Sequence, residues 1–348
     1  MKDIIYDDIF KVVEHFDKNH YLLKLKKEYE RRKVSSSKPI IDEVEKYPLP
    51  GTGNDIKVEN GKLTLYRGEN HYFKQCVANL YRDRSLEKEE DLMDIAIDRI
   101  KISDFKQILL HFPQIKKAID DKYYVDFKAI AQHYGLRTSY IDLTSDIVTG
   151  LFFASTINLD KHSYKPISKG YGYLRGYIIE DLDNNLKMRS IGLQPFLRPA
   201  RQDAFVYEAR LNEDLNKTAD FIIKFRQTEL NYLFYMLCET PVKGKEKFWP
   251  QERQVAYFPN EPDIINASNF ISITNSLTIY SVKKYCTRNK ENLDSFIKKL
   301  DRRGFDVVDE SSFDVNSIDL DRANSEIEER LFEKGKIFSF DHLPTFDR

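Results

Sequence analysis

Apolar residues near the start of the chain repeat at the spacing of an amphipathic helix. They lie three or four positions apart, which places them on one helical face: Ile5, Ile9, Val12, Val13 and Phe16. A second helical pattern over about residues 21–33 ends in a charged run that is typical of a solvated helix face. Proline and glycine then cluster at residues 47–54 and indicate a break in the chain. Residues 1–48 are therefore predicted to form an N-terminal helical extension.

After this break, short apolar runs of strand length alternate with helical patterns. Strands are predicted at residues 63–67, 139–143, 171–180, 204–211 and 221–225. Helical segments are predicted at about residues 72–134, 147–156, 228–237, 290–303 and 320–335. Strands gathered in the middle of the chain with helices around them predict an α+β fold, with a mixed or antiparallel central sheet flanked by helices.

Composition excludes several protein classes. With 41% hydrophobic and 32% charged residues, the chain is neither a disordered protein nor a membrane protein. The N-terminus lacks the charged-then-apolar order of a signal peptide. Cys76, Cys238 and Cys286 are far apart in the sequence, which excludes a cysteine-rich zinc module and a disulfide framework. We therefore expect a cytoplasmic protein that makes no membrane contact, and no motif predicts a metal site.

The charges are balanced, with 55 basic and 56 acidic side chains and a net charge of −1. A protein that binds nucleic acid through its phosphates usually carries a basic excess, so the whole-chain balance argues against a dedicated nucleic-acid binder. It does not exclude a local basic patch. The 21 Tyr and 23 Phe residues are expected mainly in the core and in strands, with a base-stacking surface as the alternative.

Two of the predicted strand and helix ends carry candidate binding residues. Arg67 follows Tyr66 at the end of a strand and precedes Gly68, so its guanidinium could clamp a phosphate while the glycine allows close approach. The alternative is an ion pair that pins the strand end. His133 ends a helix that Gly135 is expected to stop. The helix dipole favours a protonated histidine there, which could cap the helix or act in a cleft as an acid, a base or a phosphate partner.

Polar residues on two further strands complete the set of candidates. Asp142 and Thr144 alternate with apolar neighbours and so point to one face of their strand, where they could bind a ligand or cap the next helix. Arg201, Gln202 and Asp203 open another strand with three different polar groups. Alternation places Arg201 and Asp203 on one face and Gln202 on the other, unless a bulge turns one of them. An ordinary solvated strand entry is the alternative.

Three blocks of the sequence, taken together, resemble the FRG domain, a family named for a Phe/Tyr-Arg-Gly tripeptide. The first block is Leu-Tyr-Arg-Gly at residues 65–68. The second and most specific is Ala-Gln-His-Tyr-Gly-Leu-Arg-Thr-Ser-Tyr-Ile-Asp-Leu-Thr at residues 131–144. The third is Arg-Pro-Ala-Arg-Gln-Asp-Ala-Phe at residues 198–205, with Asp where the family usually has Gly. The resemblance covers about residues 60–320, leaves a C-terminal helix and tail at residues 321–348, and implies a bacterial toxin or phage-defence protein.

The same blocks are similar, more distantly, to ADP-ribosyltransferases of the Arg-Ser-Glu type. This resemblance implies an ADP-ribosyltransferase-like core with NAD as a substrate, bound by Tyr66, Arg67, Gly68, Tyr134 and Arg201. The implied catalytic residues are Arg67, His133, Asp142, Thr144, Gln202 and Asp203. In this family pattern Arg67 would hold the diphosphate, Thr144 would order the cleft, and Asp203 or Gln202 would steady the departing nicotinamide riboside. The sequence departs from the pattern because no Glu stands at the expected last position.

Two other functions remain open at the level of the sequence. A nuclease-type toxin could use His133 as the acid or base and Arg67 as a phosphate clamp. A module without catalytic activity could bind a nucleotide in the same cleft. The macromolecular target could be a protein or a nucleic acid, and a regulatory or neutralising protein partner is also possible.

Overall fold

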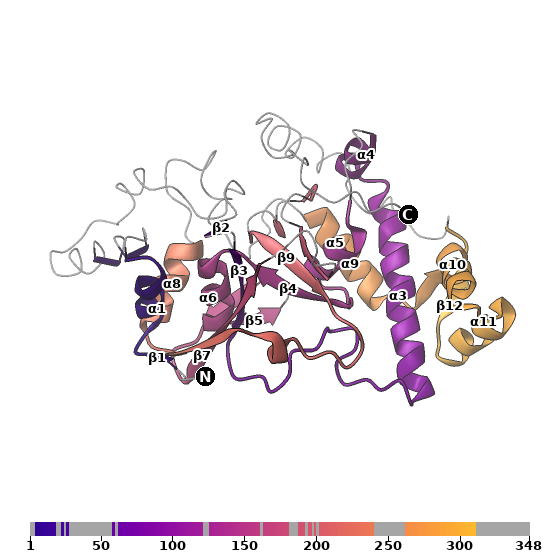
Figure 1. The fold of residues 1–348 in the computed structure, drawn as a ribbon. Coiled ribbons are helices and arrows are strands. Elements are labelled where there is room, and N and C mark those ends of the chain that lie inside the picture. Colours follow the sequence, from indigo (N-terminus) through magenta and orange to yellow (C-terminus); the bar gives the residue numbers. More distant parts are fainter. Residues whose placement is uncertain are drawn as a thin grey trace.

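The computed structural model describes residues 4–18, 22–23, 26–27, 58–59, 62–120, 125–160, 163–180, 187–191, 194–196, 198–199, 202–239 and 262–310. In this part of the chain, helices surround a mixed β-sheet (Figure 1). The predicted α+β fold is therefore confirmed.

The central sheet runs through the middle of the molecule (Figure 1). Its strands lie in the order β1-β10-β7-β3-β4-β9-β8, and β2 pairs with the start of β3. β1 runs parallel to β10, whereas the other neighbours pair antiparallel. The strands are β1 (Ile4–Tyr6), β2 (Val58–Glu59), β3 (Lys62–Glu69), β4 (Tyr140–Thr144), β7 (Tyr171–Ile179), β8 (Met188–Ser190), β9 (Ala204–Glu208) and β10 (Phe221–Arg226).

The sheet is nearly divided between β3 and β4. β3 pairs with β7 along its length, from Leu63 to Glu69. The ladder between β3 and β4 holds a single residue pair, Tyr66 with Thr144, although both strands lie wholly within the described residues. Beyond that pair the two strands diverge, which opens the middle of the sheet.

One group of helices packs at the β1 end of the sheet. It comprises α1 (Ile9–Phe16), α6 (Ile147–Ser155) and α8 (Leu230–Glu239). Phe10, Phe152 and Phe234 are buried together in one core cluster. α6 also packs directly on β3 and closes one side of the opening in the sheet.

A second group of helices lies at the opposite end of the sheet (Figure 1). It comprises α3 (Glu89–Leu109), α4 (Pro113–Asp120), α5 (Phe127–His133) and α9 (Pro262–Ile273). Their core includes Phe105, Phe112 and Tyr134, together with Phe196 from a loop. Gly135 has a φ of 90° and follows α5, so the prediction that this glycine ends the helix in a left-handed conformation is confirmed.

The last described elements pack on the outer side of α3. They are β11 (Ser276–Thr278), α10 (Ile279–Asn289), α11 (Leu293–Arg302) and β12 (Asp306–Val308). β11 and β12 form a small parallel pair, and β5 (Thr156–Asp160) pairs with β6 (Ser163–Pro166) in another two-stranded sheet. A short 3₁₀ helix, η2 (Leu215–Thr218), precedes β10.

Several predicted boundaries differ from the structure. Ile5 lies in β1 rather than in the first helix, because the chain here pairs with β10 and forms the edge of the sheet. The predicted helical segment 72–134 begins only at Glu89, and η2, β1, β8, α9 and α10 were not predicted. Most of the helix predicted at 21–33, and all of the helix predicted at 320–335, lie outside the described residues.

No helix among the described residues is both long enough and apolar enough to cross a membrane.

Candidate functional site

A cleft with a volume of about 470 Å³ lies where β3 and β4 diverge. It is within the size range of small-molecule sites. The wall opposite the sheet comes from α6 and from the β5–β6 pair. Residues from both sheet halves and from α5 line the cleft, among them Tyr66, Arg67, Gly68, Gln132, His133, Asp142, Thr144, Phe153, Tyr164, Arg198 and Gln202. Seven residues proposed from the sequence therefore share one cavity: Tyr66, Arg67, Gly68, His133, Asp142, Thr144 and Gln202.

Arg67 crosses the opening between the two strands. Its Nη1 donates a hydrogen bond of 2.9 Å to the backbone carbonyl of Asp142, on β4. The guanidinium thus ties β3 to β4 through the backbone and forms no ion pair with the carboxylate of Asp142, which is also a described residue. Its Nε is buried and has no hydrogen-bond partner among the described residues. Arg67 therefore keeps donor capacity at the cleft, as an anion clamp requires.

Gly68 is required by packing against α6. A Cβ atom at this position would lie 1.8 Å from the carbonyl oxygen of Gly150 and 2.7 Å from the backbone nitrogen of Ala154. The sequence predicted that Gly68 lets the backbone or a ligand come close, and the group that comes close is a helix. Tyr66 lines the cleft, and its ring also packs edge-on against Phe16, with the ring centroids 5.8 Å apart.

Asp142 is the carboxylate that faces the cleft. Ile141 and Leu143 are buried in the core, so the predicted alternation of apolar and polar faces along β4 is confirmed. Oδ2 of Asp142 accepts a hydrogen bond of 3.0 Å from Nε2 of Gln132, whereas Oδ1 has no hydrogen-bond partner among the described residues. The side chain is 43% exposed, but Oδ1 is buried, so a ligand would reach this carboxylate on the side of Oδ2.

Thr144 orders the turn that follows β4. Its hydroxyl donates a hydrogen bond of 2.6 Å to the carbonyl of Gln202 and accepts one of 2.9 Å from the backbone N–H of Asp146. Asp146 is the N-cap of α6, because its carboxylate accepts hydrogen bonds from the backbone of Val148 and Thr149. The hydroxyl of Thr144 is thus occupied within the protein, which gives this residue a positioning role.

His133 lies in the cleft lining but is almost completely covered. Its side chain is 3% exposed, and Nε2 lies 3.7 Å from Oδ1 of Asp142. Burial lowers the pKa of His133 to about 4, although the carboxylate of Asp142 acts in the opposite direction. The sequence-based expectation of a protonated histidine is therefore corrected: removal from water outweighs the helix dipole, and the imidazole is neutral near pH 7.

Gln202 and Asp203 separate at the turn before β9. Gln202 lines the cleft, whereas Asp203 is not among its lining residues. Asp203 has a left-handed φ of 40°, and its carbonyl accepts a hydrogen bond from the backbone N–H of Ser145. Burial, with a further contribution from Asp146, raises the pKa of Asp203 to about 7. This turn conformation, rather than strand alternation, decides which of the two side chains enters the cleft. Arg201 lies outside the described residues.

Tyr134 is a core residue and does not line the cleft. Its ring packs edge-on against Phe196, with centroids 5.8 Å apart, and it is 5% exposed. The assignment of Tyr134 to NAD binding is therefore corrected. Its place at the end of α5, one residue after His133, turns the ring toward α4 and α9 instead of toward the sheet opening.

The structure adds residues to the cleft that the sequence did not single out. Nη1 of Arg198 donates a hydrogen bond of 2.7 Å to the carbonyl of His133, and Gln132 joins Asp142 to Thr138 by hydrogen bonds. Arg82 contributes a third guanidinium to the lining. Both Gln132 and Arg198 stand inside the sequence blocks that resemble the FRG domain, but neither spacing nor alternation indicated that they face the same cavity as Asp142.

The charges of the cleft favour an anionic ligand. Three guanidinium groups, from Arg67, Arg82 and Arg198, line it together with the carboxylates of Asp142 and Glu69. Glu69 is engaged elsewhere, because its Oε2 lies 3.0 Å from Nε of the buried Arg175. No cluster of three or more metal-ligating side chains occurs among the described residues. The arrangement is thus an arginine-lined pocket with one accessible carboxylate.

Comparison with known protein families identifies one domain. Residues 62–163 match the family model of the FRG domain. This segment is similar to the FRG domain and includes Arg67, His133, Asp142 and Thr144. The block at residues 198–205 lies beyond the matched segment. Neither the curated proteins nor the solved structures contain a match to this chain.

Proposed function

We propose that the cleft between β3 and β4 binds a dinucleotide such as NAD and that the protein transfers its ADP-ribosyl group to a macromolecule. The observation that carries this proposal is the accessible carboxylate of Asp142 in a pocket lined by arginines. The arginines Arg67, Arg82 and Arg198 suit a diphosphate, because guanidinium groups bind phosphate oxygens through paired N–H donors.

The reaction breaks the bond between C1′ of the ribose and the ring nitrogen of nicotinamide. The bonding electron pair leaves with nicotinamide, and positive charge develops on the ribose. A carboxylate near this carbon stabilises that charge. A nucleophile of the target then forms the new bond to C1′ and loses a proton to solvent or to a nearby base. We assign the carboxylate role to Asp142 in place of Asp203, because Asp142 lines the cleft and Asp203 does not.

His133 supports Asp142 in this scheme as a positioning residue. It is neutral near pH 7, almost completely buried, and 3.7 Å from Oδ1 of Asp142. The hydrogen bond from Gln132 fixes the other carboxylate oxygen. Together these neighbours would hold the carboxylate in one orientation without neutralising it.

The test is to incubate the purified full chain with NAD labelled in the adenylate phosphate, in the presence of cellular protein and nucleic acid. Released nicotinamide and transferred label are both measured. Arg67→Ala and Asp142→Asn are expected to lower turnover by about 100-fold or more, as the loss of a transition-state contact does. Asp203→Asn is the matched control for Asp142→Asn and should change turnover less than about threefold.

Two results would overturn the proposal in different ways. If neither nicotinamide release nor label transfer occurs with the wild-type chain, the cleft does not act on NAD. If Asp203→Asn abolishes turnover and Asp142→Asn does not, the carboxylate has been assigned to the wrong residue.

Cleavage of a nucleotide or nucleic acid without NAD is the second candidate. It is favoured by the position of His133, whose Nε2 has no hydrogen-bond partner among the described residues and lies in the same cleft as Arg67. A neutral imidazole could accept a proton, although a pKa of about 4 makes it a weak base. Turnover of labelled RNA or DNA in the absence of NAD, lost in His133→Ala, would favour this function.

A further inference from the structure

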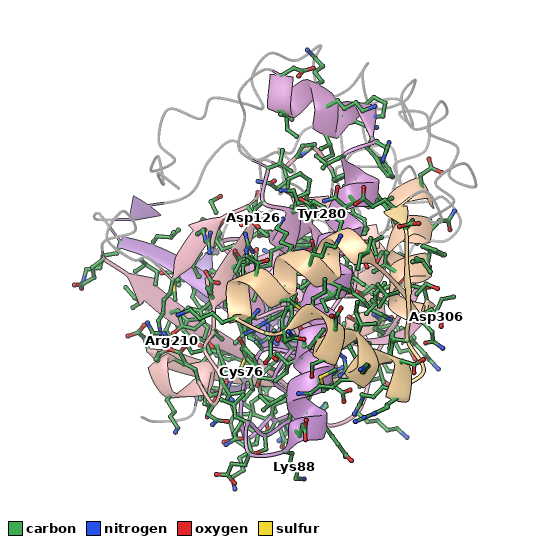
Figure 2. All side chains as sticks on the ribbon, turned by 90° about the vertical axis from the view of Figure 1, so that its right-hand side faces the viewer. Cys76, Lys88, Asp126, Arg210, Tyr280 and Asp306 are labelled. Carbon is green, nitrogen blue, oxygen red and sulfur yellow. The ribbon has the colours of Figure 1, made fainter. Side chains whose placement is uncertain are left out.

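A second and larger cavity, with a volume of about 1250 Å³, lies between the β8–β9 side of the sheet and helices α3 and α10. We call it the basic groove. Its helix wall carries Arg99, Lys106, Lys284 and Arg288 on α3 and α10. The opposite wall, which we call the sheet wall, carries Lys187, Arg189 and Arg210 in or next to β8 and β9, together with Lys128 at the start of α5. Figure 2 looks onto this side of the molecule, with Tyr280 in the first turn of α10 and with Asp126 and Arg210 from the opposite wall.

The helix wall carries cations that no described carboxylate neutralises. No ion pair with a described residue involves Arg99, Lys106, Lys284 or Arg288. Burial, followed by repulsion from Lys284 and Arg288, lowers the pKa of Lys106. The repulsion shows that these three charges are close to one another. Four like charges on two neighbouring helices therefore face the cavity.

The sheet wall is different, because three of its four cations, Lys128, Lys187 and Arg189, are paired with carboxylates. Lys128 lies 2.6 Å from Glu208, which also pairs with Arg189, and Lys187 pairs with Glu213. These pairs hold the wall in place and leave it little net charge. The electrostatic attraction for an anion thus comes mainly from the helix wall.

Aromatic rings and a buried hydroxyl line the same groove. Tyr81, Phe127 and Tyr285 line the groove. Nζ of Lys106 lies 4.6 Å from the centre of the Phe127 ring, and the Tyr285 ring stacks with one face on Phe296. Oγ of Ser103, between Arg99 and Lys106 on α3, is buried and has no hydrogen-bond partner among the described residues. Cations along a groove combined with aromatic side chains are the features that bind single-stranded nucleic acid, since phosphates meet the charges and bases stack on the rings. An acidic peptide would use the charges but not the rings.

The groove and the cleft share two elements, α5 and β4. Phe127 and Lys128, at the start of α5, line the groove, whereas Gln132 and His133, at its end, line the cleft. His133 lies six positions after Phe127 along the helix, which is a distance of about 9 Å, the length of about three stacked nucleotides. On β4, Tyr140 in the groove and Asp142 in the cleft lie on the same face of the strand.

We propose that the basic groove binds a single strand of nucleic acid and leads it to the cleft, so that the macromolecule on which the cleft acts is a nucleic acid. This inference rests on the proposed function, because the strand in the groove is taken to be the target of the reaction in the cleft. Binding of a strand to the groove can be measured without that reaction. It also explains how a chain with a net charge of −1 can bind phosphates, because the cations are gathered in one place.

The experiment measures binding of the full chain to fluorescently labelled single-stranded RNA and DNA 20-mers by anisotropy, at several salt concentrations and without NAD. Lys284→Gln/Arg288→Gln is expected to weaken binding about tenfold or more and to reduce the salt slope by about 1 to 2. The control Lys283→Gln/Lys298→Gln removes the same charge from exposed positions outside the groove and should change the affinity less than about twofold.

Three outcomes would overturn the inference. Wild-type protein could fail to bind either oligonucleotide at low salt. The groove variant could bind as tightly as the wild type, or the control could weaken binding as much as the groove variant does. A poly-glutamate peptide could bind as tightly as the oligonucleotides, which would indicate an acidic protein partner. Thermal melting of each variant, monitored by circular dichroism, ensures that a loss of binding is not a loss of fold.

Failure of the cleft proposal can be told apart from failure of the groove proposal. Arg67→Ala is expected to bind the oligonucleotides like the wild type, because Arg67 lines the cleft and not the groove. If wild-type protein binds the strand but releases no nicotinamide, the groove proposal is supported and the proposed reaction of the cleft with NAD is wrong. If nicotinamide is released and no strand binds, the cleft proposal is supported and the target of the reaction is not a nucleic acid.

Discussion

The cleft and the basic groove use arginine and lysine in opposite ways. In the cleft, Arg67 and Arg198 are fixed by hydrogen bonds to the backbone carbonyls of Asp142 and His133. In the groove, the helix-wall cations, such as Lys284 and Arg288, extend from one helix and have no described carboxylate partner. The cleft therefore presents donors in fixed directions, and the groove presents charge that can adjust to a flexible ligand.

This difference follows from where each site lies in the fold. The cleft is inside the sheet, at the single residue pair that joins β3 to β4, and its walls are backbone-paired strands and the closely packed α6. The groove lies between the edge of the sheet and two helices. Fixed donors favour one small ligand with a defined shape, whereas long side chains on helices favour a repeating polyanion.

The first prediction removes the close packing that shapes the cleft. Gly68→Ala would place a Cβ atom 1.8 Å from the backbone oxygen of Gly150, and backbone cannot move aside as a side chain can. We expect loss of about 3 kcal/mol or more of unfolding free energy and at least about a 100-fold fall in nicotinamide release. Chemical denaturation and the turnover assay measure the two effects.

Gly150→Ala is the matched control for this substitution. Its Cβ would lie 2.8 Å from Cδ1 of Leu174, the end of a flexible side chain, and 3.2 Å from Cβ of Tyr66. Alanine also has a higher helix propensity than glycine. Gly150→Ala should therefore lower the unfolding free energy much less than Gly68→Ala does. Equal losses of unfolding free energy in the two variants would contradict the packing argument.

The second prediction separates the two sites by ionic strength. If four helix-wall cations contact phosphates, raising the salt concentration from 50 to 200 mM should weaken single-strand binding by about 50-fold. The Michaelis constant for NAD in the cleft should change by less than about fivefold, because the donors there are buried and hydrogen-bonded at fixed positions. A salt response of equal size at both sites would remove the distinction between them.

The third prediction concerns a carboxylate that the cleft does not use. Burial raises the pKa of Asp203 to about 7, so the folded protein holds a proton that the unfolded chain releases near pH 4. The contribution of Asp203 to stability is then greatest below pH 4 and declines as the pH rises to about 7. Asp203→Asn should raise the unfolding free energy by about 1–3 kcal/mol at pH 8 and leave it unchanged near pH 4.

Asparagine suits the left-handed backbone at this position, since Asn adopts positive φ more readily than most residues. Denaturation of the wild type and the variant at pH 4 and pH 8 measures the difference. An increase of the same size at both pH values would show that the effect does not come from the charge of Asp203.

The candidate site shows which side-chain positions can be predicted from local sequence patterns and which cannot. Alternation along β4 was sufficient to place Asp142 and Thr144 on one face, because side-chain direction in a regular strand depends only on the position in the sequence. The same rule did not work for Gln202 and Asp203, which lie in a turn with a left-handed residue and not in the strand itself. The protonation of His133 was also mispredicted, because the helix dipole is a local effect and burial is not.

The sequence by itself determined the α+β class, the strands β3, β4, β7, β9 and β10, and the FRG-like blocks at residues 65–68 and 131–144. These depend on residue spacing and composition within short windows. Only the tertiary structure decided that β3 and β4 part after a single pair, that Gln132 and Arg198 face the same cleft as Asp142, and that distant cations gather in one groove. Such features depend on which segments meet in space, and that is set by the packing of the whole fold.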